Sequence, residues 1–218
     1  MLSTIIGIFA GGLLTIATAI IVELYRKPKL QITICEPHVK SFTSEYLAQK
    51  AKFLLLEIIN VKLPFCFRWM SRNPAVQCHG KIDFYDLDGQ KVFETAMPIK
   101  WSGKSPNIGV SLKINENIIS VIDPTPDYIA ENIYPGESMK MDVVAKFDSD
   151  ENCYGWTWAN ETEKGWRNKE FELLRKNYIA KISLFTSGEK YEKYFRVLNE
   201  TNFDNFRLTE VLNKDVLK

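Results

Sequence analysis

The sequence lacks the residue patterns of the common catalytic and metal-binding motifs. It contains no glycine-rich phosphate loop, no serine-centred nucleophile elbow and no paired-aspartate motif. The cysteines, Cys35, Cys66, Cys78 and Cys153, have spacings that match no zinc template, and Cys35 with His38 forms only half of a metal site. We therefore expect a protein that uses no cofactor or metal and is not an enzyme, with catalysis by dispersed residues as the open alternative.

A basic excess is also missing. The chain has 28 Lys and Arg residues against 27 Asp and Glu residues. Beyond Lys29, the chain has 25 basic residues against 26 acidic ones. A duplex-binding domain usually carries a clear basic excess, so we expect no nucleic-acid partner. The composition, 45% hydrophobic and 25% charged, is that of a folded domain.

Charged side chains are absent from Met1 to Val22. At about 1.5 Å per residue, an apolar helix over this run is long enough to cross a hydrocarbon core of about 30 Å. No Lys or Arg precedes the run, which argues against a cleaved signal peptide, although residues 17–19 (ATA) could form a cleavage site. The sequence thus predicts a transmembrane helix over residues 1–25, with membrane lipid as its partner.

Basic residues follow this helix in a short linker, residues 26–30. They are Arg26, Lys27 and Lys29. Because basic flanks stay cytoplasmic, we expect a single-pass membrane protein whose C-terminal domain is cytosolic. The reverse orientation would make the chain an extracytoplasmic adhesion-type domain.

Small residues recur every fourth position of the same helix, and therefore along one face. Small residues let two helix backbones approach closely in lipid, so the pattern predicts association with a second copy or with a partner helix. Chance is the alternative, since glycine is common in membrane helices. The residues are Ser3, Gly7, Gly11, Thr15 and Ala19.

Downstream segments alternate between apolar and polar residues with period two, as half-buried strands do. Residues 75–86 (AVQCHGKIDFYD) place Val76 with the apolar face, and residues 139–147 (MKMDVVAKF) place Lys146 on the polar face. Residues 52–63 (KFLLLEIINVKL) are nearly all apolar and predict a central strand. The SGEK turn predicts a hairpin with Gly188 at its tip.

Seven or eight such segments, with almost no helix between them, predict a mainly β chain. The expected architecture is a single N-terminal transmembrane helix followed by one antiparallel β-sandwich over residues 31–200. Residues 201–218 are expected to form a C-terminal tail with a short helix.

The spacing of Leu173 and Tyr178 at a strand start resembles the tyrosine corner of immunoglobulin-like sandwiches. With the stretches FLLLEIIN, AVQCHGKIDFYDLDG and IYPGESMKMDVVAKF, residues 30–200 resemble immunoglobulin-like domains of the fibronectin type III kind and bacterial cell-adhesion-related domains. The resemblance implies the fold and no function, because many unrelated proteins share it. The loops over residues 101–133 and 148–169 are unusually long for this type.

Two aromatic stretches are candidate contact surfaces for a protein partner, a small ligand or a membrane. Trp and Arg dominate binding hot spots, and both also suit an anionic lipid surface. The first stretch (PFCFRWMSR) contains Arg68, Trp69 and Arg72, whose alternative role is to cap the open end of the core. The second (CYGWTWANETEKGW) contains Trp156, Trp158 and Trp166, in either a recognition loop or a flap packed over one sheet.

These observations favour a non-enzymatic binding or scaffolding module, displayed to the cytosol by a membrane helix. A second hypothesis is a membrane effector of a microbial defence system, in which the sandwich senses a ligand or partner and the helices self-associate. The extracytoplasmic adhesion domain is the third hypothesis.

Overall fold

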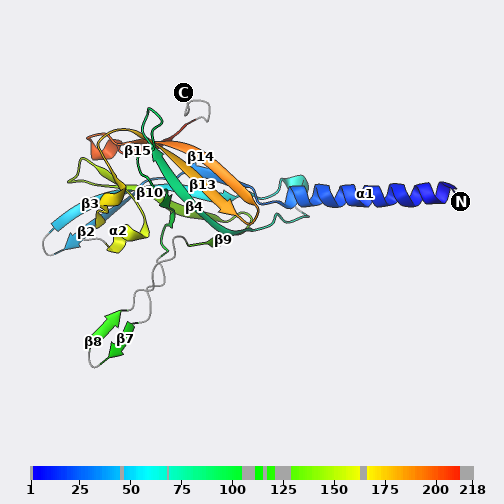
Figure 1. Ribbon diagram of the computed structural model, residues 1–218, viewed down its shortest axis with the longest axis horizontal. Coiled ribbons are helices and arrows are strands. Elements are labelled where there is room, and N and C mark those ends of the chain that lie inside the picture. The colour runs from blue at the N-terminus through cyan, green and yellow to red at the C-terminus, as the bar shows by residue number, and fades with distance from the viewer. Residues whose placement is uncertain are drawn as a thin grey trace.

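The computed structural model describes residues 2–44, 47–67, 69–104, 111–114, 117–120, 129–162 and 166–211. Within these ranges, side chains are not described for residues 2–10, 43–44, 47–48, 111–114, 117–120 and 161–162. Helix α1 (Leu2–Arg26) extends away from a body made of two antiparallel sheets (Figure 1). The protein is therefore mainly β.

The first sheet has seven strands in the order β1-β3-β10-β11-β12, with β2 also beside β3 and β6 also beside β10. The long strand β3 pairs with β2 through its first half and with β1 through its second half. The strands are β1 (Leu30–Ile34), β2 (His38–Ser44), β3 (Leu47–Asn60), β6 (Lys100–Trp101), β10 (Ser138–Phe147), β11 (Cys153–Gly155) and β12 (Glu172–Leu173).

The second sheet has six strands in the order β15-β14-β13-β4-β5, with β9 also beside β4. The β13–β14 hairpin turns at Gly188, whose φ of +96° suits glycine. The strands are β4 (Ala75–Tyr85), β5 (Met97–Pro98), β9 (Glu131–Ile133), β13 (Tyr178–Thr186), β14 (Glu189–Leu198) and β15 (Arg207–Glu210).

The remaining elements are short. Strands β7 (Ser111–Ile114) and β8 (Asn117–Ser120) pair only with each other. The helical turns are η1 (Phe65–Phe67), α2 (Trp158–Thr162), η3 (Lys169–Phe171) and η4 (Phe203–Asn205). The expected C-terminal tail thus contains η4 and β15, and residues 212–218 lie outside the described residues.

The main core lies between the two sheets. Leu56 and Ile58 of β3 face Ile82 and Phe84 of β4, and all four are almost fully buried. Tyr178 is 1% exposed, and burial raises the pKa of its hydroxyl to about 12, although this group also hydrogen-bonds the Leu174 backbone. The immunoglobulin-like assignment stays a prediction.

A bulge in β10 reverses its alternation. The register against β3 shifts between Asp142 and Val144, so Val144 faces the main core while Phe147 faces the opposite side of the sheet. Lys146 turns inward, is 1% exposed, and donates to Asn199 Oδ1 at 2.9 Å and the Glu200 carbonyl at 2.6 Å. The prediction that Lys146 faces water is therefore wrong, and its burial lowers its pKa.

The predicted transmembrane helix over residues 1–25 is not supported. In the described part of the chain, no helix combines the length and the apolar character needed to cross a bilayer. This finding overturns the expected single-pass localisation with a cytosolic domain.

The predicted role of Arg26, Lys27 and Lys29 in membrane orientation depends on this transmembrane helix and loses its basis. These residues instead connect α1 to the sheets. Lys27 forms an ion pair with Glu189 at 2.8 Å, and the Arg26 carbonyl accepts a hydrogen bond from the backbone of Asn73 at 2.6 Å. The Lys29 backbone N–H donates to Asn60 at 3.2 Å. The end of α1 is therefore fixed to both sheets by polar contacts.

The predicted small-residue face of α1 is described only in part. Gly11, Thr15 and Ala19 are exposed, and the Thr15 hydroxyl donates to the Gly11 carbonyl within the helix. The side chain of Ser3 and the surroundings of Gly7 are not described. Helix association stays a prediction.

Candidate functional site

The outer face of the first sheet, turned away from the second sheet, carries its own apolar cluster. Phe53 and Leu55 of β3 and Phe147 of β10 are buried there, because the chain beyond β11 folds back over them. From that segment, Trp156 packs into the cluster and is 4% exposed. The outer face is thus closed by a segment of irregular chain.

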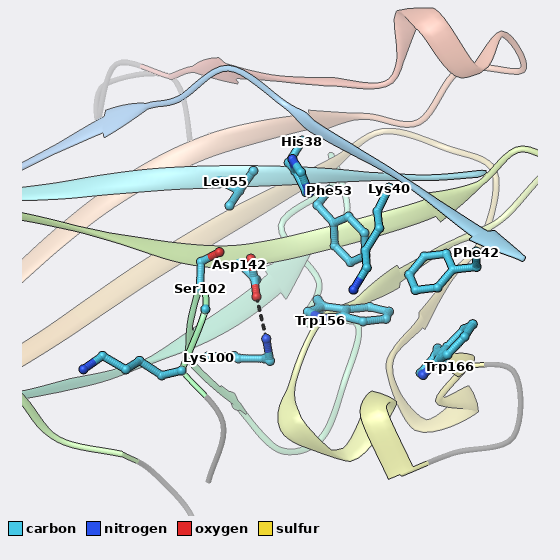
Figure 2. A pocket seen from close by; sticks show the side chains of 12 residues that line it. His38, Lys40, Phe42, Phe53, Leu55, Lys100, Ser102, Asp142, Trp156 and Trp166 are labelled. Atoms are coloured by element: carbon cyan, nitrogen blue, oxygen red, sulfur yellow. Dashed lines mark hydrogen bonds and ion pairs between the residues drawn. The ribbon is translucent and has the colours of Figure 1, made fainter. Parts of the chain in front are cut away.

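This covering leaves a cavity of about 540 Å³, which we call the aromatic cleft (Figure 2). Its walls come from β2, β3, β6 and β10 and from the residues that follow β6 and β11. The lining residues are His38, Lys40, Phe42, Phe53, Leu55, Lys100, Ser102, Gly103, Lys104, Asp142, Trp156 and Trp166.

Two aromatic pairs form most of the apolar wall. The rings of Phe53 and Trp156 meet edge to face, with centroids 4.8 Å apart and planes at 84°. The rings of Phe42 and Trp166 lie with centroids 4.3 Å apart and planes at 37°. Such rings offer flat, polarised surfaces against which another ring can stack.

A buried ion pair lies at the floor of the cleft. Lys100 Nζ lies 2.9 Å from Asp142 Oδ2, and both side chains are 6% exposed (Figure 2). The same ammonium lies 4.7 Å from the centroid of the Trp158 ring. Removing either charge would leave its partner buried without compensation, so this pair holds β6 and β10 in a defined arrangement.

Trp166 is held in an unusual backbone conformation. Its φ of +58° lies in the left-handed region, which is strained for a bulky side chain and typically costs about 1–3 kcal/mol. Strain of this kind persists only where neighbouring contacts impose it. Arg167, the next residue, supplies these contacts.

The Arg167 guanidinium binds the turn after β10 and the edge of β3. Its Nε lies 2.5 Å from Asp150 Oδ2, its Nη2 donates to Gln49 Oε1 at 3.0 Å, and its Cζ lies 4.1 Å from the centroid of the Phe147 ring. Burial acts to raise the pKa of Asp150, but the hydrogen bonds from Arg167 and Ser149 hold it below its ordinary value. Arg167 thereby anchors the chain next to Trp166, whose ring packs against Phe42.

The structure separates the two aromatic stretches singled out in the sequence. Trp156 and Trp166 line the aromatic cleft and Trp158 packs beneath it, so this stretch both covers the sheet and forms a cleft wall. Trp69, 77% exposed, and half-buried Arg72 lie near the end of α1, and Arg72 donates to the Lys27 carbonyl. Arg68 lies outside the described residues.

Several cleft residues were missed in the sequence because they come from strands far apart in the chain. One signal was present: His38, Lys40 and Phe42 alternate along β2 and therefore share a face. No comparable signal connects Lys100 with Asp142, since pairing of β6 with β10 brings them together.

Two observations on the described chain concern metal and thiol chemistry. No cluster of three or more His, Cys, Asp and Glu residues there could hold a metal ion. Burial raises the pKa of Cys78 and of Cys153 to about 12, so both thiols stay protonated at neutral pH.

Comparison with known proteins finds no relative of this chain. No family model matches the chain, and neither the curated proteins nor the solved structures include a significant match.

Proposed function

We propose that this protein is a non-enzymatic binding module that takes a small ligand in the aromatic cleft. The cleft itself carries the proposal: its volume of about 540 Å³ falls in the range of about 300–1,000 Å³ typical of ligand pockets. Such pockets combine apolar and aromatic walls with a few fixed polar groups, which is the composition found here.

The cleft is formed before any ligand arrives. The buried pair of Lys100 and Asp142 fixes its floor, the contacts of Arg167 anchor the chain beside Trp166, and the Trp166 ring packs against Phe42. A site whose side chains are already ordered loses less conformational entropy on binding, which favours affinity. Preorganisation therefore supports a recognition role for this face.

The position of the cleft's carboxylate argues against its use as a general base. This carboxylate, on Asp142, is engaged by Lys100 at 2.9 Å and is buried with it. A general base needs to reach a proton on the substrate, and this carboxylate is directed to an ammonium instead.

Titration with N-phenyl-1-naphthylamine, a neutral aromatic dye that fluoresces in apolar surroundings, tests the proposal. We expect saturable binding at one site on the full chain. The variant Trp166→Gly removes one wall, and glycine accepts the φ of +58° without strain. We expect this variant to bind the dye about tenfold more weakly, as for loss of a hot-spot aromatic residue.

Tyr134→Ala is the matched control, because Tyr134 is an exposed aromatic residue that does not line the cleft. It should bind the dye as the native protein does. Unsaturable binding, or equal affinity in native protein and Trp166→Gly, would contradict the proposal.

A further inference from the structure

The lysines of the aromatic cleft differ in their ion pairing with the described residues. Lys100 is paired with Asp142, and Lys104 lies 3.3 Å from Glu131. Lys40 forms no ion pair with any residue that the structure describes. Among the described residues, the cleft therefore presents one ammonium group, on Lys40, for which no ion pair is found.

This ammonium group is directed into the cleft. Lys40 Nζ lies 5.1 Å from the centroid of the Phe42 ring, and its side chain points from β2 toward Trp156 (Figure 2). A flat molecule that stacks against these rings would place a substituent beside Lys40. The aromatic walls and the charge thus belong to one binding surface.

The sign of this charge distinguishes two classes of ligand. Aromatic residues grouped around a cavity can bind cations through their ring faces. Here Lys40 already occupies one ring face, and the carboxylate of Asp142 is neutralised by Lys100. A cationic ligand would meet the like charge of Lys40, whereas an anionic ligand would gain an ion pair with it.

Building on the proposed function, we propose that the ligand of the aromatic cleft is a flat aromatic molecule that carries an anionic group, with its ring against Trp156 and Trp166 and its anion at Lys40. A carboxylate and a phosphate share this chemistry. Lys100, at the floor of the cleft, would keep its ion pair with Asp142.

A matched pair of dyes tests the charge preference. The dye 8-anilino-1-naphthalenesulfonate is N-phenyl-1-naphthylamine with one added sulfonate. We expect the sulfonate dye to bind the native protein about five- to tenfold more tightly than the neutral dye, as for a partly exposed ion pair of about 1 kcal/mol. In Lys40→Gln the ratio of the two affinities should fall to about one, whatever the absolute affinity for the neutral dye.

Lys190→Gln is the control variant. Lys190 also lies over a phenylalanine ring, 5.8 Å from the centroid of Phe185, but on the second sheet and paired with Glu192. It should leave the preference for the sulfonate dye intact. Equal affinity for the two dyes in native protein, or an undiminished preference in Lys40→Gln, would overturn the inference.

The two proposals fail in different ways. If the neutral dye does not bind, or binds without regard to Trp166, the proposed function is wrong. If it binds at the cleft and the sulfonate adds nothing, only the anionic class is wrong.

Displacement of the sulfonate dye then separates the sources of the anion. Displacement by indole-3-acetate indicates a carboxylate ligand, and displacement by adenosine monophosphate indicates a phosphate ligand. Tryptamine carries the indole ring with a positive charge and should not displace the dye. Displacement by tryptamine, or by neither anion, would contradict the inference.

Discussion

One face of β3 and β10 packs against a second sheet, and the other packs against a segment of irregular chain. The inner face is matched by complementary strands, so Leu56 and Val143 are fully buried in a continuous core. The outer face is covered by Trp156 and its neighbours, which leave a cavity. Two sheets can close a core completely, whereas a covering loop leaves space that a ligand can occupy.

The closure of the two faces also differs in chemistry. The inner face is closed by a large apolar cluster, with buried Lys146 as a polar exception, while the outer face depends on the ion pair of Lys100 with Asp142 and on the polar contacts of Arg167. The outer face should therefore respond to loss of charge and to pH, and the inner face to loss of volume.

The largest effect should come from Asp142→Ala. It leaves the Lys100 ammonium buried without its partner, which typically costs about 3–5 kcal/mol in the free energy of unfolding. Urea denaturation measures this loss. The double variant Lys100→Met with Asp142→Leu should recover most of it, because it removes both buried charges; failure to recover would show that the pair itself stabilises the fold.

Adjacent leucines on β3 compare the two faces directly. Leu56 faces the inner core at 0% exposure, and Leu55 lines the aromatic cleft at 5% exposure. We expect Leu56→Ala to lower the free energy of unfolding by about 4 kcal/mol and Leu55→Ala by about 2 kcal/mol, because a residue beside an existing cavity loses fewer contacts. Equal losses in urea denaturation would show that the outer face is packed as tightly as the inner one.

The Arg167 contacts should make the outer face sensitive to acid. The pKa of Asp150 is lower in the folded protein than its unfolded value of about 3.9, so its stabilising contribution is present above about pH 4 and is lost as the pH falls through the folded pKa. Unfolding of native protein should become easier over this range, and the pH dependence should be flatter in Asp150→Asn. The exposed neighbour Asp148→Asn serves as the control and should keep the native profile.

The smallest effect should come from Glu192, on the second sheet. Hydrogen bonds from Lys190 and Lys181 lower its pKa to about 2, so its contribution is present above about pH 4.5 and is lost between about pH 4.5 and pH 2. Because this group is partly exposed and screened, Glu192→Gln should cost less than about 1 kcal/mol at neutral pH. Denaturation at high salt should reduce the difference further; a salt-independent difference would contradict this explanation.

The strands that alternate or run apolar could be located from sequence. The apolar run of residues 52–63 predicted a central strand, and β3 lies at the centre of the first sheet with both faces covered. The SGEK turn marked the hairpin of β13 and β14. In these cases the local pattern and the tertiary environment agree.

Bulges could not be read from the pattern. Val76 was predicted to face inward and is 38% exposed, because the β4 register shifts between Ala75 and Cys78 and Gln77 adopts a φ of +52°. The shift in β10 likewise falls beside two consecutive valines, where either one could face the core. The aromatic cleft depends on such long-range registers, so only the tryptophan segment and the alternation of β2 indicated it.

The bulge in β10 has an evolutionary consequence. Were one residue deleted there, the pleat beyond it would invert, exchanging Phe147 with Lys146 across the sheet. An aromatic ring would leave the outer apolar cluster, and an ammonium group would be pushed into it. A single codon thus separates a strand that builds two apolar layers from one that builds only one.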